Sequence, residues 1–127
     1  MRYTVLIYSN PDVVDLFAAM SDDEKQAAYQ VYWDVQTDLE ASGELVDSKA
    51  IDEAGQRFVR VDAEGVTTVA DAPLPADGDV VTGYYLVDVA DESRAIQIAA
   101  RFPEARVARG IRVARNFTQA DFDALGM

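Results

Sequence analysis

The order of strand-forming and helix-forming segments constrains the fold of this chain more than any other feature. Runs rich in β-branched and aromatic residues predict strands, and longer runs with apolar residues at helical spacing predict helices. The predicted strands are residues 3–8, 44–51, 56–61, 66–69, 80–89 and 106–115, and the predicted helices are residues 13–20, 21–42 and 92–102. This order is that of an α+β, ferredoxin-like βαββαβ fold with an extra hairpin at residues 57–69.

Two long helices cannot cover both faces of such a sheet. They cover one face, so the other apolar face needs a partner. Pairing with the same sheet of a second copy is the simplest solution, and it can leave a cavity between the two sheets. A short helix in the tail, residues 117–127, completes the predicted elements.

Local signals define the longest helix. Ser21 and Glu24 form a capping-box pattern, and Gly43 suits the position just past the helix end. Trp33 lies off the apolar stripe of this helix. The stripe comprises Ala28, Val31, Tyr32, Val35 and Leu39.

Composition limits the partners. The chain has 127 residues, half of them hydrophobic, which predicts one domain over residues 1–127. Its net charge of −12 argues against binding to nucleic acid or to an anionic membrane. No segment reads as a membrane span or a signal peptide, so we expect a cytoplasmic protein.

The charge is unevenly distributed. Residues 1–93 hold 20 acids and five bases, whereas residues 94–127 hold three acids and six bases. The basic segment is either a solvated edge strand or a face for anions or self-association.

The chain contains neither cysteine nor histidine. Disulfides, thiolate chemistry, histidine-ligated metals and Ser-His or Cys-His catalysis are therefore excluded within the chain. Acid–base chemistry must come from Asp, Glu, Tyr or Lys. We expect no cofactor and no metal, because Asp77-Gly78-Asp79 offers too few ligands for a calcium loop.

Five segments carry a family resemblance. The chain opens with RYTVLIY at residues 2–8, continues with LEASGEL at 39–45 and DAPLPADGDVVTGYYL at 71–86, and ends with AARFP at 99–103 and IRV at 111–113. In this order and spacing they resemble the YCII-related family with its DGPF motif, as a divergent member. The resemblance implies a dimeric α+β barrel and a homodimer, but it names no substrate.

The departures from the family pattern fall in the charged loop. Ala72 and Leu74 replace the Gly and Phe of the motif, and Ala76 and Gly78 stand where the family has Glu and Lys. Arg112 replaces a Glu, and the chain has no His for the His-Asp pair of some YCII-like proteins. This pattern favours a specialised or non-catalytic member. Pro73 and Pro75 are expected to stiffen the loop.

Asp71 is the candidate catalytic residue. It is either a turn-former that accepts backbone N–H groups or a carboxylate facing the cavity as base or acceptor. Arg60 and Arg112 are candidate ligands for an anion, since strand arginines can bind a carboxylate bidentately if they face the cavity. Otherwise Arg60 faces solvent, and Arg112 pairs with a carboxylate on a neighbouring strand.

Tyr8, Tyr85 and Trp33 are candidate aromatic walls. Tyr84 and Tyr85 face opposite sides of a strand, so one should pack under the helices and the other should enter the cavity or the dimer interface. Tyr29 and Trp33 share a helix face and either pack against a loop or the tail or line a ligand site.

Two functions remain open. The first is a small-molecule-binding protein or simple non-redox catalyst of isomerase or lyase type, acting on a small organic acid or aromatic metabolite. The second is a non-catalytic regulatory or protein-interaction module. The resemblance adds weight to the second, because relatives often occur beside or fused to extracytoplasmic-function sigma factors.

Overall fold

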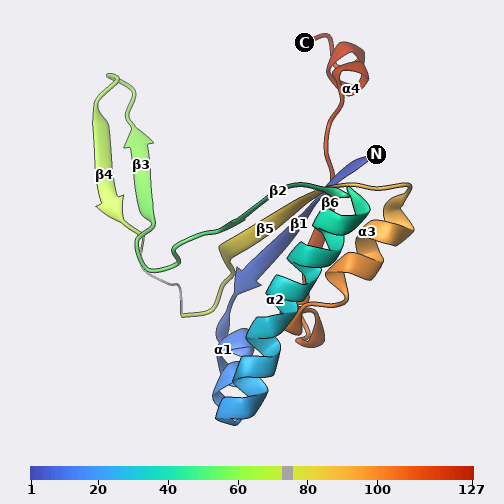
Figure 1. Ribbon diagram of the computed structural model, residues 1–127. Helices are drawn as coiled ribbons and strands as arrows, with labels where there is room; N and C mark the ends of the chain where they lie inside the picture. The colour runs from blue at the N-terminus through green and yellow to red at the C-terminus, as the bar shows by residue number, and fades with distance from the viewer. Residues whose placement is uncertain (73–75) are drawn as a thin grey trace.

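The computed structural model describes residues 1–72 and 76–127 and confirms an α+β, ferredoxin-like fold (Figure 1). The roles predicted for Pro73 and Pro75 lie outside the described residues. The elements are β1 (Arg2–Ser9), α1 (Pro11–Ala18), α2 (Asp22–Ser42), β2 (Leu45–Ala50), β3 (Arg57–Val61), β4 (Thr67–Asp71), β5 (Val80–Asp88), α3 (Glu92–Ala99), the 3-10 turn η1 (Pro103–Arg106), β6 (Arg112–Arg115) and α4 (Gln119–Ala124).

The main sheet has four strands in the order β2-β5-β1-β6, and every neighbouring pair is antiparallel. The inner position predicted for the strand at residues 80–89 is confirmed, because β5 lies between β2 and β1. β3 and β4 pair only with each other in a separate two-stranded sheet, which confirms the predicted hairpin.

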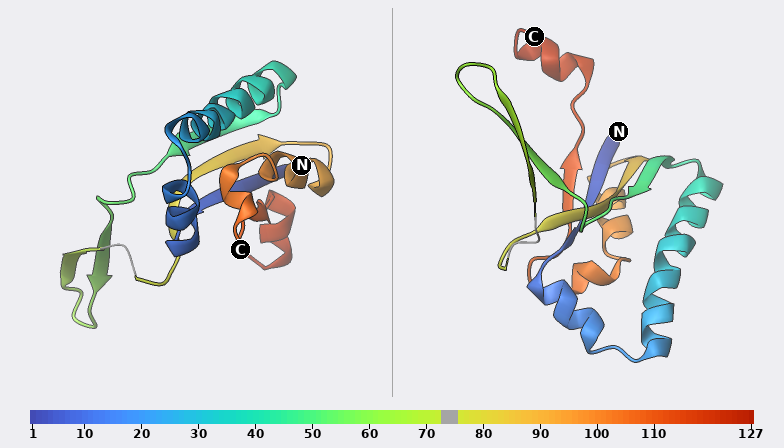
Figure 2. Two further views of the ribbon diagram at one scale, coloured as in Figure 1. Left: turned by 90° about the horizontal axis from the view of Figure 1, so that it is seen from below. Right: turned by 90° about the vertical axis from the view of Figure 1, so that its left-hand side faces the viewer.

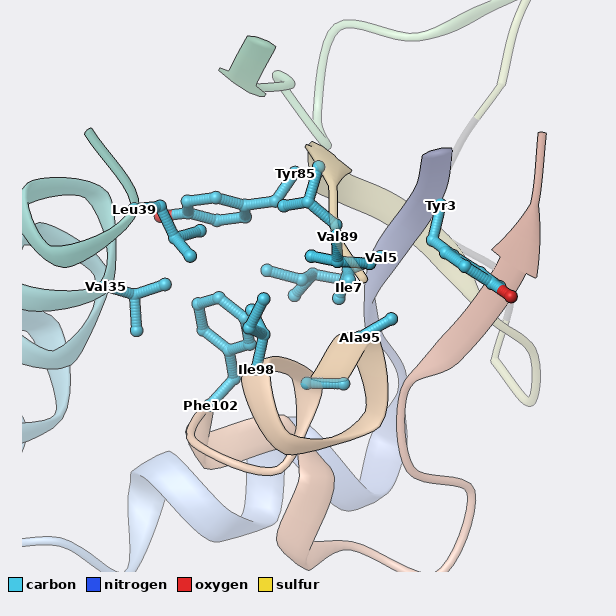
Figure 3. Close-up of a cluster of buried hydrophobic side chains, with 12 residues drawn as sticks. Tyr3, Val5, Ile7, Val35, Leu39, Tyr85, Val89, Ala95, Ile98 and Phe102 are labelled. Atoms are coloured by element: carbon cyan, nitrogen blue, oxygen red, sulfur yellow. The ribbon is translucent and has the colours of Figure 1, made fainter. Parts of the chain in front are cut away.

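The core lies between the main sheet and the helices α2 and α3, which cover the same face (Figures 2 and 3). Side chains alternate along a strand, so Tyr3, Val5 and Ile7 of β1 are buried toward the helices. They meet Val35 and Leu39 of α2 and Ile98 and Phe102 in and after α3.

The opposite face of the main sheet, called here the open face, is half-buried and covered by neither α2 nor α3. It carries Thr4, Leu6, Tyr8, Tyr84 and Leu86. The β3–β4 hairpin and the C-terminal segment with α4 project on this side of the sheet, away from α2 (Figure 2). The sequence-based expectation that the helices leave one face uncovered therefore holds for the single chain.

α2 begins and ends where the local signals indicate. The Ser21 hydroxyl accepts from the Glu24 amide at 3.1 Å, the Glu24 carboxylate accepts from the Ser21 amide at 3.2 Å, and Gly43 ends the helix at φ 77°. Within the described part of the chain, α2 and the other helices lack the length and hydrophobicity required to cross a membrane.

Two predicted boundaries differ most from the structure. The helix expected at residues 92–102 ends at Ala99, because Phe102 precedes Pro103 and takes an extended backbone with ψ 145°. The strand expected at residues 106–115 begins only at Arg112. The turn η1 and the left-handed Gly110, at φ 64°, occupy the stretch before it.

Candidate functional site

A cleft of about 600 Å³ lies between α2 and the main sheet. α2 forms one wall, while β2, β5 and β1 form the other, with η1 contributing Glu104. The lining comprises Ile7, Tyr29, Tyr32, Trp33, Gln36, Ser48, Lys49, Ala50, Thr82, Gly83, Tyr84, Tyr85 and Glu104. The cleft thus lies mainly on the helical side of the sheet, although Tyr84, a residue of the open face, also contributes to the lining.

The α2 wall is aromatic because Tyr29, Tyr32 and Trp33 are spaced at i, i+3 and i+4 and share one side of the helix. The Tyr29 ring stacks on Phe17 of α1, with centroids 5.9 Å apart, so α1 supports this wall. Trp33 is 69% exposed and lines the cleft. An exposed indole beside a cleft offers a flat apolar surface to a ligand.

Glu104 is the buried acid of the cleft. Glu104 is only 5% exposed, and its Oε1 accepts a short hydrogen bond from the Tyr32 hydroxyl. Its Oε2 is buried and has no hydrogen-bond partner among the described residues. Burial raises the pKa of the Glu104 carboxyl, and the bond from Tyr32 opposes this only in part. The protonated form of Glu104 therefore persists to a higher pH than that of an exposed glutamate.

Neighbouring aromatic residues hold this acid in place. The Tyr85 hydroxyl donates to the carbonyl of Tyr32 at 3.1 Å, and the ring of Phe102 lies 5.8 Å from that of Tyr32 and 5.0 Å from that of Tyr85. Burial raises the pKa of Tyr32 and of Tyr85, so both phenols stay protonated and act as hydrogen-bond donors. These hydrogen-bond and ring contacts form the bottom of the cleft.

The opposite wall supplies small and polar groups. The Ser48 hydroxyl donates to Gln36 Oε1 at 2.6 Å and joins β2 to α2 across the cleft. Gly83 lies in the same wall, where an added Cβ would approach the carbonyl oxygen of Lys49 to 3.2 Å. A larger residue at position 83 would therefore crowd β2.

The structure divides the residues predicted for the site among three places. Trp33 and Tyr85 line the cleft. Tyr8 and Arg112 meet on the open face, where the Arg112 guanidinium lies 5.7 Å from the centre of the Tyr8 ring. Arg60 and Asp71 lie on the hairpin.

On the hairpin, both predicted residues contact solvent. The Asp71 side chain is 86% exposed, and its carboxylate lies 3.7 Å from Arg57. The Arg60 guanidinium lies 5.6 Å from the centre of the Phe58 ring. Within one chain, neither residue reaches the cleft lining, so their predicted roles as base and anion ligand stay predictions.

The acids of the Asp77-Gly78-Asp79 segment have a different partner. Both carboxylates form ion pairs with Arg109, that of Asp79 at 3.5 Å. Asp79 also accepts from the side chain of Asn10, which caps α1. The Asp77–Asp79 segment therefore contacts two distant parts of the chain, through Asn10 before α1 and through Arg109 before β6.

The sequence reasoning missed Glu104 and the role of Tyr32 beside it. Tyr32 was placed on the apolar stripe of α2, where its ring does pack against the core. A signal for Glu104 was present, because residues 94–127 hold only three acids and this one directly follows Pro103. Its burial depends on contacts with α2, 72 positions away, which no local pattern reveals.

The sequence was compared with models of protein families. The family model of the YCII-related domain matches residues 1–116. The chain belongs to the YCII-related family. The match includes the cleft, the hairpin and β6, whereas α4 lies beyond the matched residues of this YCII-related protein. A comparison with curated proteins found no match.

Proposed function

We propose that this YCII-related protein is a cytoplasmic, single-domain homodimer that binds a small aromatic metabolite or organic acid in the cleft beside α2. The observation that carries the proposal is Glu104, a buried acid with a free oxygen at the base of an aromatic cleft. Small-molecule sites commonly combine an apolar lining with a few polar groups and a volume of about 300–1,000 Å³.

The cleft favours a flat ligand with one polar end. Tyr29, Tyr32 and Trp33 supply the aromatic wall, and Gln36 and Ser48 supply hydrogen-bonding groups on either side. Burial raises the pKa of the Glu104 carboxyl, and in its protonated form this group does not repel a ligand carboxylate and can donate a hydrogen bond to one.

A non-redox reaction of isomerase or lyase type is the catalytic form of this proposal. In this role Glu104 acts from its ionised form: a carboxylate whose pKa is raised is a stronger base, which can take a proton from a carbon beside a carbonyl group and return it to another atom of the same molecule. Glu104 is suited to that role by its environment. Asp71 remains the proposed base only if a second copy brings the hairpin to a bound ligand.

A second candidate is a regulatory or protein-interaction module. The observation in its favour is the hairpin, whose β3 and β4 residues are all exposed although several are apolar. Exposed apolar surface of this kind marks interaction sites in soluble proteins.

Fluorescence of Trp33 tests ligand binding, because it is the only tryptophan of the chain. We expect phenylacetate to change its emission saturably, and cyclohexylacetate, which lacks an aromatic ring, to bind about 2- to 13-fold more weakly, since ring stacking contributes about 0.5–1.5 kcal/mol. Ser48→Phe should fill the cleft and abolish the phenylacetate response. Val46→Phe, on the same strand but outside the lining, should preserve it.

The same titration can overturn the proposal. A flat response to both acids, or a Ser48→Phe variant that binds phenylacetate like the wild-type chain, would show that the cleft is not a ligand site.

A further inference from the structure

Three hydroxyl groups at the cleft donate their hydrogens to other groups of the protein. The Tyr32 hydroxyl donates to Glu104, and the Tyr85 hydroxyl, whose ring extends from β5 toward α2 (Figure 3), donates to the carbonyl of Tyr32 at 3.1 Å. The Ser48 hydroxyl donates to Gln36 Oε1 at 2.6 Å. A hydroxyl has one hydrogen but two lone pairs, so each oxygen keeps the capacity to accept after its hydrogen is used. The three groups therefore meet a ligand as acceptors.

Other polar groups of the lining are engaged in the same way. Three further donors bind protein acceptors: Thr82 Oγ1 donates to the carbonyl of Ile7 at 3.4 Å, the Tyr84 hydroxyl to Asp47 at 2.6 Å, and Gln36 Nε2 to Glu40 at 2.8 Å. The donors of Tyr29 and Trp33 belong to residues that are 46% and 69% exposed, so these groups can bind water. Away from these two residues, acceptors outnumber free donors in the lining.

The charges at the cleft have the same bias. Among the described residues, the lining holds two charged side chains, Lys49 and Glu104. The Lys49 ammonium lies 2.5 Å from Asp47 Oδ1 and is neutralised by it. Glu104 takes part in no ion pair within the described part of the chain, and its buried Oε2 has no hydrogen-bond partner there. When Glu104 is ionised, its charge is the unpaired charge of the cleft.

The aromatic wall on α2 suits a cation as well as a ring. The faces of Tyr29, Tyr32 and Trp33 carry partial negative charge, which attracts an ammonium group. The same faces can stack with an aromatic ring of a ligand. The wall can thus contact both ends of a flat molecule that carries a positive charge.

We propose that the cleft selects an aromatic amine in its ammonium form, with the ammonium group bound to Glu104 Oε2 and the ring against the aromatic wall of α2. The inference rests on the proposed function and narrows its ligand to a cation. An ammonium group has three hydrogens and no acceptor, which matches an acceptor-rich lining. A ligand carboxylate has acceptors alone, so Glu104 can donate to it only while that acid is protonated.

The burial of Glu104 favours this pairing. Removing charged groups from water is the main cost of a buried ion pair. Glu104 is only 5% exposed, so the protein's share of this cost is met on folding and not on binding. The ligand ammonium loses its own water, which the free lone pairs of Tyr85 and Ser48 can partly replace.

A bound ammonium also acts on the protonation of Glu104. A positive charge beside a carboxyl group favours the ionised form, so an amine that binds the protonated acid releases that proton to solvent. The titratable groups that face Glu104 are the phenols of Tyr32 on α2 and Tyr85 on β5, and burial raises the pKa of both. Both phenols therefore stay neutral near pH 7, which leaves Glu104 as the group whose charge changes.

Titration of Trp33 fluorescence with phenethylamine and phenylacetate tests the selection, because the two ligands share a ring and differ in charge. At pH 8 we expect the wild-type chain to bind phenethylamine at least about tenfold more tightly. Glu104→Gln keeps an acceptor for Tyr32 but presents an amide donor to the cleft, so it should weaken phenethylamine binding at least about tenfold and remove the preference. Glu53→Gln, which removes the same charge from the exposed loop before β3, should keep the wild-type ratio.

The pH dependence of the wild-type chain gives a second measurement that needs no variant. Between pH 5 and pH 8 the affinity for phenethylamine should rise and that for phenylacetate should fall, since the two ligands need opposite protonation states of Glu104. Both ligands keep their own charge over this range, because alkylamines titrate near pH 10 and carboxylic acids near pH 4, as in lysine and glutamate.

The outcomes separate this inference from the proposed function. No response to either ligand overturns both. Phenylacetate that binds as tightly as phenethylamine or more tightly, and is blocked by Ser48→Phe, overturns the selection of a cation and leaves the cleft as a ligand site. A preference for the amine that Glu104→Gln does not change, or affinities that do not vary with pH, overturn the role of Glu104.

Discussion

Glu104 shows how one residue links burial, stability and pH. Its carboxyl group has a raised pKa because burial disfavours the charged form. The native state therefore holds this proton more tightly than the unfolded chain, in which the group titrates near 4.5. Stability contributed by the neutral acid is fully present below that value and is lost as the pH rises toward the folded pKa.

Glu104→Gln removes this titration while keeping the shape of the side chain. We expect the free energy of unfolding of the wild-type protein to fall by about 1–3 kcal/mol more than that of the variant between pH 4 and pH 8, the cost of a buried group without a partner. Urea unfolding at several pH values measures it. Glu53→Gln, in the exposed loop before β3, should keep the wild-type profile. Parallel profiles for wild type and Glu104→Gln would contradict the argument.

At the scale of elements, the structure separates what local sequence determines from what it does not. The ends of α2 were predicted because Ser21, Glu24 and Gly43 act on their own neighbours. The hairpin was likewise predicted from a short turn between two strands. The end of α3 was missed by three residues, because the effect of Pro103 on Phe102 was not weighed against the apolar pattern.

The cleft could not be predicted from the sequence for a related reason. Trp33 and Tyr85 were identified as aromatic walls and do line it, but the cavity was expected between two sheets. Its position depends on how far α2 stands from β2, which is set by contacts such as Ser48 to Gln36. Asp71 was predicted to be either a turn-former or a carboxylate of the cavity, and no local pattern indicates that the hairpin forms a sheet separate from the main one.

A capping comparison tests which helix belongs to the cooperative fold. Ser21→Ala removes the cap of α2 and should lower the melting temperature by about 3–5 °C, since such caps contribute about 1 kcal/mol. Thr118→Ala removes the same capping box from α4, which buries no residue, and should leave the temperature unchanged. Circular dichroism melts measure both. Equal losses would show that α4 is part of the cooperative unit within the single chain.

At the scale of the whole molecule, the fold covers one face of its main sheet and leaves a second apolar surface and a projecting hairpin exposed. The core of the chain lies entirely between the main sheet and the helices. No hairpin residue belongs to it. The stability of the single chain and that of the proposed homodimer should therefore be separable by experiment.

If unfolding is coupled to dissociation, the melting temperature must depend on protein concentration. Raising the concentration 100-fold stabilises the native dimer by about 2.7 kcal/mol. With an unfolding entropy of roughly 2.1 cal/mol/K per residue over two chains, this corresponds to an increase of about 5 °C. Scanning calorimetry at about 2 and 200 µM measures it. A wild-type melting temperature that does not change with concentration would mean that the open face stays uncovered in solution, and the exposed apolar hairpin would then have to be explained by a different partner.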